Sequence, residues 1–169
     1  MEQVKDLFKK YSKIIDFVLF GYMAYCAVLI ILQMITNDTS ILEMETLYTI
    51  GWFLQWPVLL LGAGVLFFAG NAWSSRLHYV VTEVALLWGV VNFHRVSSYG
   101  FTFHYFPGGF FAQLVLLILY GGAAALLAFM LFTGKTFSVN DAVKAAQSAG
   151  NKVVEEGKKL GDKVDGDKK

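Results

Sequence analysis

Four long apolar stretches, separated by short polar segments, are the feature that most limits how this chain can fold. They cover residues 14–35, 47–69, 77–93 and 110–132. A helix needs about 20 residues to cross roughly 30 Å of hydrocarbon, and every stretch except the third reaches that length without its polar flanks. Between the first and last stretches the only Lys or Arg side chains are Arg76 and Arg95. The sequence therefore predicts an all-α integral membrane protein built as a four-helix bundle.

The composition narrows the class of protein further. Hydrophobic residues make up 56% of the 169-residue chain, more than in an average soluble domain. This length suffices for a transmembrane domain over 14–133, a cytosolic amphipathic lead-in over 1–13 and a lysine-rich tail over 134–169, but not for a soluble catalytic domain. Cys26 is the only cysteine, which excludes an intramolecular disulfide, a CxxC redox pair and a cysteine zinc site. We expect no enzymatic activity, catalytic residue, metal or cofactor.

The distribution of lysine and arginine predicts the topology. The lead-in and the tail are rich in lysine, the connection at 70–76 contains Arg76, and the loop after the first stretch is acidic. The positive-inside rule then places both termini and the 70–76 connection in the cytosol, with Arg95 as the one dissenting charge. Asn37 begins a glycosylation sequon on the outer side, so close to the membrane that we expect it to be unmodified. An endomembrane or the plasma membrane is favoured.

Both ends of the chain show amphipathic patterns. Residues 1–13 are either a helix on the anionic inner leaflet or a solvated extension of the first membrane helix. The tail opens with a capping box at 138–141, and its valines recur with a period of about 11 residues. It resembles the lipid-surface helices of synucleins and lipid-droplet coat proteins, and its alternative is a solvated, partly disordered segment. The candidate contacts to anionic lipid headgroups are Lys144, Lys152, Lys158 and Lys159.

Glu83 is the strongest candidate for a functional side chain. It lies about 10 Å of helix rise beyond Arg76, inside the third apolar stretch, where an ionisable residue is costly and suggests a function. Tyr79 is one turn before it on the same face, and Asp16 lies at a similar depth in the first helix. These four residues either form a polar site that binds a cation or shares a proton, or are structural, with Glu83 bonded to Tyr79 or to a partner helix.

Small residues indicate where helices approach closely. Gly62 and Gly64 lie in the second stretch, and Gly121 and Gly122 lie in the fourth. Such residues let two helix backbones meet, so we predict either a contact between the second and fourth helices or association with another copy or another membrane protein.

The positions of the histidines argue against a haem or metal protein, and the positions of the basic clusters argue against a nucleic-acid-binding protein. His78 and His94 are about 24 Å apart along one helix and cannot ligate one haem iron. His94 and His104 could approach each other, but no ligand spacing supports a metal site. Nucleic-acid binding is not expected, because the basic clusters adjoin the membrane.

The predicted layout over about residues 13–132 has both ends in the cytosol, a tight inner turn between the second and third helices, and Arg76 at the start of the third helix. This layout resembles that of a MARVEL-type tetraspan protein. The resemblance implies a non-enzymatic role in vesicle trafficking or membrane organisation. The chain lacks the loop cysteines of claudins. The alternative is a small transporter, a channel or an accessory subunit of a larger membrane complex, such as a respiratory one, that uses Glu83 and Asp16. Four polar residues within the apolar stretches distinguish the two alternatives. If their side chains face one another inside the bundle, the transporter or channel is favoured, and if they lie on separate faces, the membrane organiser is favoured. These residues are Glu83, Gln55, Asn92 and Gln113.

Overall fold

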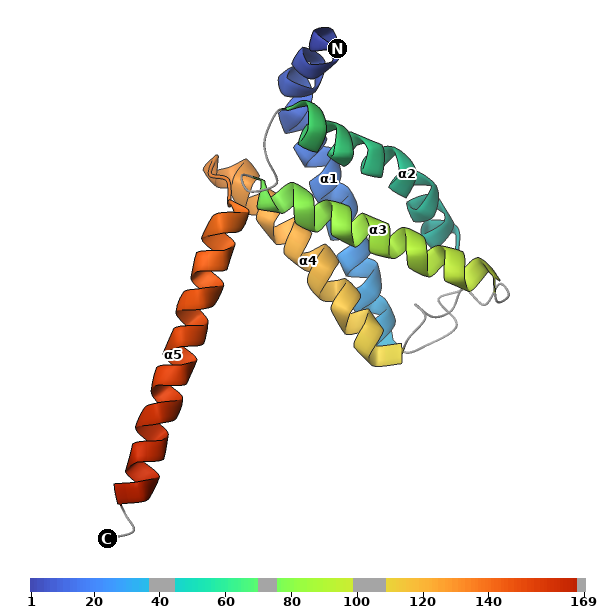
Figure 1. Cartoon of the computed structure of the whole chain (residues 1–169). Helices are drawn as coiled ribbons and strands as arrows, with labels where there is room; N and C mark the ends of the chain where they lie inside the picture. Colours follow the sequence, from blue (N-terminus) through green and yellow to red (C-terminus); the bar gives the residue numbers. More distant parts are fainter. Residues whose placement is uncertain (37–44, 70–75, 99–108, 167–169) are drawn as a thin grey trace.

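The computed structural model describes residues 1–36, 45–69, 76–98 and 109–166, and in this part of the chain it contains helices and no strands. Its helices are α1 (Glu2–Thr36), α2 (Glu45–Phe68), α3 (Leu77–Ser98), α4 (Gly109–Thr133) and α5 (Val139–Gly166) (Figure 1). The all-α prediction is confirmed for this part of the chain. The sequon at Asn37, most of the 70–76 connection and residues 99–108 lie outside the described residues.

The first four helices pack around a shared core. α1 packs against α2 and α4, and α3 packs against the same two helices. The core consists of large apolar side chains that are fully buried, among them Leu19, Met23, Ile30, Val65, Leu86, Leu116 and Leu127. The predicted contact between α2 and α4 is therefore wrong, because each of them packs on α1 and α3 instead.

Ring contacts and a backbone hydrogen bond bring one end of each of these helices together. Phe8 in α1 stacks on Phe68 at the end of α2, with ring centroids 5.4 Å apart. The Leu77 amide at the start of α3 donates a hydrogen bond to the Phe137 carbonyl, just after α4, with an N–O distance of 3.0 Å. We call this the basal end of α1–α4. The described ends of the chain, α5 and the start of α1, both extend from it (Figure 1).

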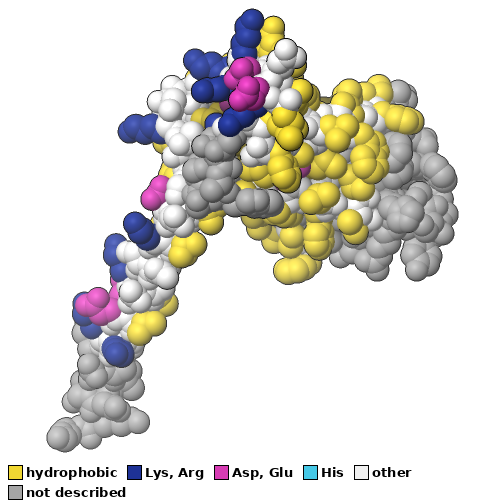
Figure 2. All heavy atoms as spheres, turned by 45° about the horizontal axis from the view of Figure 1, so that its top comes forward, with side chains coloured by type: hydrophobic (Ala, Val, Ile, Leu, Met, Phe, Trp, Pro, Cys, Tyr) yellow, Lys and Arg dark blue, Asp and Glu magenta, His cyan; other side chains and the backbone are white. Residues whose placement is uncertain are grey.

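Two helical segments, Glu2–Leu32 and Gln113–Thr133, are long and apolar enough to cross a membrane. Shorter apolar segments, Phe53–Phe68 and Leu77–Val91, lie in α2 and α3. Hydrophobic side chains also cover much of the outer surface of these helices (Figure 2). The most exposed include Leu60, Phe67, Phe111, Ile118 and Phe132.

The lead-in at 1–13 is the first part of α1. α1 has 35 residues, which corresponds to about 52 Å of helix and exceeds the roughly 30 Å of a hydrocarbon core. Phe8 is half-buried against α2, whereas Val4 and Leu7 are exposed. The structure thus shows residues 2–36 as one helix, and contact of residues 1–13 with the inner leaflet stays a prediction.

The junction between α4 and α5 has defined caps. Gly134 ends α4 with a φ of +68°, a conformation that glycine adopts without strain. Ser138 begins α5, because its Oγ accepts a hydrogen bond from the Asp141 amide at 3.2 Å, as the capping pattern predicts. Between them, the Phe137 ring packs on Phe129, with centroids 5.0 Å apart.

α5 is a single helix whose described side chains are mostly exposed. It extends away from α1–α4 (Figure 1), and its hydrophobic and charged side chains lie on opposite sides (Figure 2). Lys159 and Glu155 form an i, i+4 ion pair at 3.2 Å, but both side chains are about 70% exposed, so the pair adds little stability.

Candidate functional site

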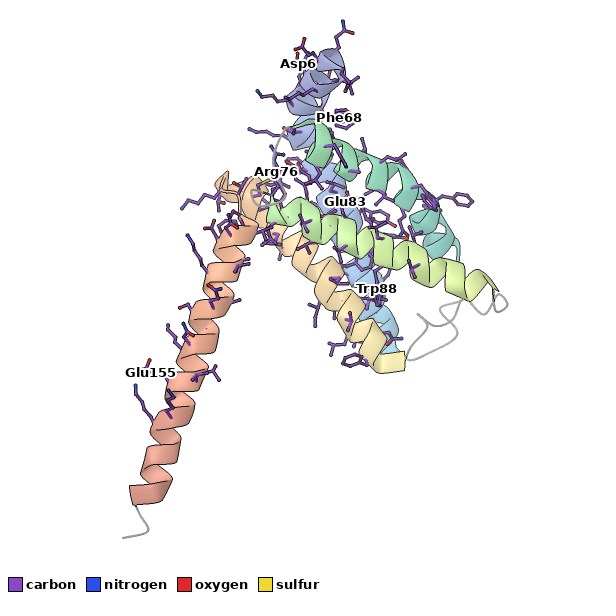
Figure 3. The ribbon with its side chains drawn as sticks, viewed as in Figure 1. Asp6, Phe68, Arg76, Glu83, Trp88 and Glu155 are labelled. Atoms are coloured by element: carbon purple, nitrogen blue, oxygen red, sulfur yellow. The ribbon has the colours of Figure 1, made fainter. Side chains whose placement is uncertain are left out.

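Glu83 lies between α3 and α2, toward the basal end (Figure 3). Its side chain is buried, and its carboxyl group rests against the backbone of Gly62. A Cβ atom on Gly62 would overlap Glu83 Oε1 and would lie 3.2 Å from Glu83 Cδ and 3.6 Å from Leu19 Cδ2. The absence of a side chain at Gly62 is therefore what makes room for the carboxyl group. Within the described residues, Glu83 Oε1 has no hydrogen-bond partner.

Tyr79 bonds to Asp16 rather than to Glu83. Its hydroxyl donates a hydrogen bond to Asp16 Oδ1, and both side chains are buried. The suggested hydrogen bond between Tyr79 and Glu83 is thus wrong, because the Tyr79 side chain reaches across to α1 whereas Glu83 packs on α2. This bond joins α1 to α3.

Arg76 lies just before α3 at the margin of this group. Its guanidinium carbon is 5.3 Å from the centre of the Tyr79 ring, within the range of a cation–π contact. The structure thus brings Asp16, Tyr79 and Arg76 together. Glu83 is one turn further along α3, in a separate environment.

His78 is a buried polar residue that the sequence analysis did not assign to this region. Its ring is almost completely buried and lies 4.2 Å from the Tyr79 ring, centroid to centroid. Neither ring nitrogen has a hydrogen-bond partner among the described residues. This burial was not predictable from the sequence, because His78 and Tyr79 are consecutive and a helix usually turns only one of two such neighbours inward.

No metal centre accompanies these side chains. The described residues contain no group of three or more His, Cys, Asp or Glu side chains that could hold a metal ion. His104 and the side chain of His94 lie outside the described part of the chain.

A second set of polar contacts lies further along α2, away from the basal end. Gln55 Nε2 donates a hydrogen bond to the Leu86 carbonyl at 2.5 Å. The Tyr22 hydroxyl donates one to the Gly51 carbonyl at 2.6 Å. Both bonds join neighbouring helices through a backbone oxygen, and both stabilise packing.

The structure places two residues of the predicted path, Glu83 and Gln55, between α2 and α3. Gln55 and Gly62, which marks the position of Glu83, are about 10 Å apart along α2. Gln113 is buried, and the side chain of Asn92 lies outside the described residues. Glu83 and Gln55 thus share the α2–α3 interface at different depths.

The remaining candidate residues fall into two groups. Gly64 packs against the Phe8 ring, whereas a Cβ on Gly121 or Gly122 would meet nothing within 4 Å. The candidate lipid-contact side chains are all exposed along α5, and they are Lys144, Lys152, Lys158 and Lys159.

Comparison with protein-family models, curated proteins and solved structures found no match to this chain. The inferences below therefore depend on its own residues.

Proposed function

We propose that this chain is a non-enzymatic multi-pass membrane protein that organises membranes or vesicles. In this proposal α1–α4 lie in the bilayer as a four-helix bundle, with both termini in the cytosol, and α5 lies on the cytosolic lipid surface. The observation that carries the proposal is the difference between two exposed surfaces. The surface of α1–α4 is mainly apolar, whereas α5 has an apolar side and a charged side.

The surface of α1–α4 supports the bilayer location. Phe67 and Phe132 are 78% and 84% exposed, and Leu60 is 70% exposed. Leaving such side chains in water costs about 25 cal/mol for each Å² of apolar surface, a cost that lipid chains would remove. Helices also satisfy their own backbone hydrogen bonds, as a bilayer requires.

The faces of α5 support the surface location. Val143, Val153 and Val154 are exposed, and their spacing places them along one side of the helix. Lys144 and Lys152 lie away from this side. A helix with an apolar face and flanking lysines binds at an anionic membrane interface.

The hydrogen bonds of Asp16 and Gln55 favour the organiser over a transporter or channel. Asp16 bonds to Tyr79, and Gln55 bonds to a backbone carbonyl. A transport path would need neighbouring polar groups along its length, whereas these serve as separate links between helices. The MARVEL-type layout agrees with this proposal.

Reconstitution of the full chain into vesicles containing anionic lipid tests the role of α5. We expect the wild type to change vesicle size or shape in electron cryomicroscopy. The double variant Val153→Asp/Val154→Asp, on the apolar face, should abolish this change. The matched control Ser148→Asp/Asn151→Asp adds the same charge on the polar face and should behave as the wild type. Equal vesicle shapes with all three proteins, or with protein-free vesicles, would contradict the proposal.

The topology has a separate test. Tags at both termini should be accessible to antibody in cells whose plasma membrane alone is permeabilised. Protection of either tag would overturn the cytosolic placement, and release of the protein by an alkaline wash would overturn its integration in the membrane.

A further inference from the structure

The environment of Glu83 is unusual for an acidic side chain. Glu83 is 7% exposed, and its Oε1 atom has no hydrogen-bond partner among the described residues. The carboxyl group fills the space that Gly62 leaves open on α2, and Leu19 of α1 lines the same space. An ionised carboxylate in such surroundings would lack the hydrogen bonds or the counter-charge that a buried charge requires.

The charged and titratable groups nearby are engaged elsewhere. On α1, Asp16 accepts the hydrogen bond of Tyr79. On α3, the guanidinium of Arg76 lies over the Tyr79 ring, and His78 contacts that ring from the adjacent position. The described parts of α2 and α4 contribute no Lys, Arg or His side chain. Glu83 thus packs on Gly62 without a cation placed against it by any of these contacts.

We propose that Glu83 is a proton-binding site that controls the contact between α2 and α3 at Gly62. With its proton bound, the carboxylic acid is neutral and packs on the Gly62 backbone. When the acid releases the proton to water, the carboxylate keeps the electron pair and becomes an unpaired charge in the interface. That charge must gain water or leave the interface, so α2 and α3 separate locally. This inference rests on the α2–α3 geometry and does not depend on the proposed function.

Infrared spectroscopy of the full chain in lipid nanodiscs tests proton binding. At pH values at which the exposed carboxyl groups of the chain are already ionised, the wild type should still show a carbonyl band of a protonated carboxylic acid, and this band should disappear as the pH is raised further. Glu83→Gln keeps the shape of the side chain but should lose this titrating band. Asp16→Asn, the matched control at the other buried carboxyl, should retain it. A band of this kind that is unchanged in Glu83→Gln, or the absence of any such band in the wild type, would overturn the proposal.

Spin-label distances test control of the helix contact, and they do not require the Asp16 variant to fold. Labels on cysteines introduced at Leu60 of α2 and Leu87 of α3 would report the separation, because both positions are exposed; Cys26→Ser removes the native thiol. The distance distribution should shift or broaden over the pH range in which the infrared band disappears. With Glu83→Gln it should stay unchanged across that range. A pH-independent distribution in the otherwise wild-type chain, or the same pH dependence with Glu83→Gln, would refute control by Glu83.

Discussion

Two glycine-containing segments look alike in the sequence and differ in the structure. The α2 segment contains Gly62 and Gly64, and the α4 segment contains Gly121 and Gly122. In α2 both glycines are buried, and side chains from other helices occupy the space beside them, Glu83 at Gly62 and Phe8 at Gly64. In α4 the space beside both glycines is open. A small residue permits close packing, but the neighbouring helix decides whether that packing occurs.

In the α4 segment, adjacent residues lie on the open side and on the packed side of the helix. Ala123 and Ala124, which directly follow the glycines, are buried. Successive residues of a helix differ by about 100° in direction, so one step along the chain turns from the open side to the packed side. The pattern of small residues therefore identifies a segment that can pack closely, but it does not predict which of these residues face a neighbouring helix.

The largest expected effect comes from filling the space at Gly62. Gly62→Leu would push Glu83 out of the α2–α3 interface and should destabilise the fold by at least about 3 kcal/mol. We expect little monodisperse protein in size-exclusion chromatography in detergent. Gly121→Leu adds the same side chain at the open position and should elute as the wild type. Equal losses in the two variants would remove the distinction between the segments.

Removal of the hydrogen bond between Tyr79 and Asp16, which joins α3 to α1, should have the next largest effect. Tyr79→Phe leaves Asp16 Oδ1 without its hydrogen-bond donor, which should lower the free energy of unfolding by about 1–3 kcal/mol. Thermal unfolding in detergent measures this change. Tyr11→Phe removes the same hydroxyl at a position that is 42% exposed and should cost less than about 0.5 kcal/mol. A Tyr79→Phe protein as stable as Tyr11→Phe would show that the bond to Asp16 does not hold α1 to α3.

The contact between Gly64 and Phe8 can be measured with a double-mutant cycle. A Cβ on Gly64 would overlap the Phe8 ring, so Gly64→Ala should destabilise the chain by about 1 kcal/mol. In the Phe8→Ala background the same substitution should cost less, because the ring is absent. The expected coupling is about 0.5–1 kcal/mol. Additive effects would mean that Phe8 does not occupy this space.

The smallest effect is expected in α4. Gly121→Ala meets no neighbouring atom within 4 Å and replaces glycine with a better helix former, so stability should stay equal or rise by up to about 1 kcal/mol. Gly62→Ala gives the matched comparison and should lower the melting temperature. A clear loss of stability in Gly121→Ala would indicate that this face packs against another copy of the chain.

Periodicity and capping rules predicted the helices well. The apolar stretches became α1–α4, and the pattern at Ser138 marked the start of α5. The pairing of helices was not predictable, because apolar stretches identify buried segments without specifying which neighbour covers them. Helix rise placed Glu83 and Asp16 at similar depths in the sequence analysis, but it did not predict the hydrogen bond between Asp16 and Tyr79.

Side-chain direction limited the prediction of the candidate site. Tyr79 and Glu83 share a face by spacing, yet Tyr79 reaches α1 and Glu83 packs on α2. The burial of His78 beside Tyr79 requires neighbours on more than one side of α3, which depends on tertiary packing. A single sequence holds no information on such crossings.

The short junction between α4 and α5 has a consequence for the strength of lipid binding. The Phe137 carbonyl bonds to Leu77, and the Phe137 ring packs on Phe129, so the first turn of α5 is tethered to the basal end. For a module tethered by a short linker, binding becomes intramolecular, with an effective concentration in the millimolar range. Under the proposed function, with α1–α4 in the bilayer, α5 would need only a weak intrinsic affinity for lipid to remain bound. A modest change in surface charge or curvature would then be enough to release it, without loss of the protein from the membrane.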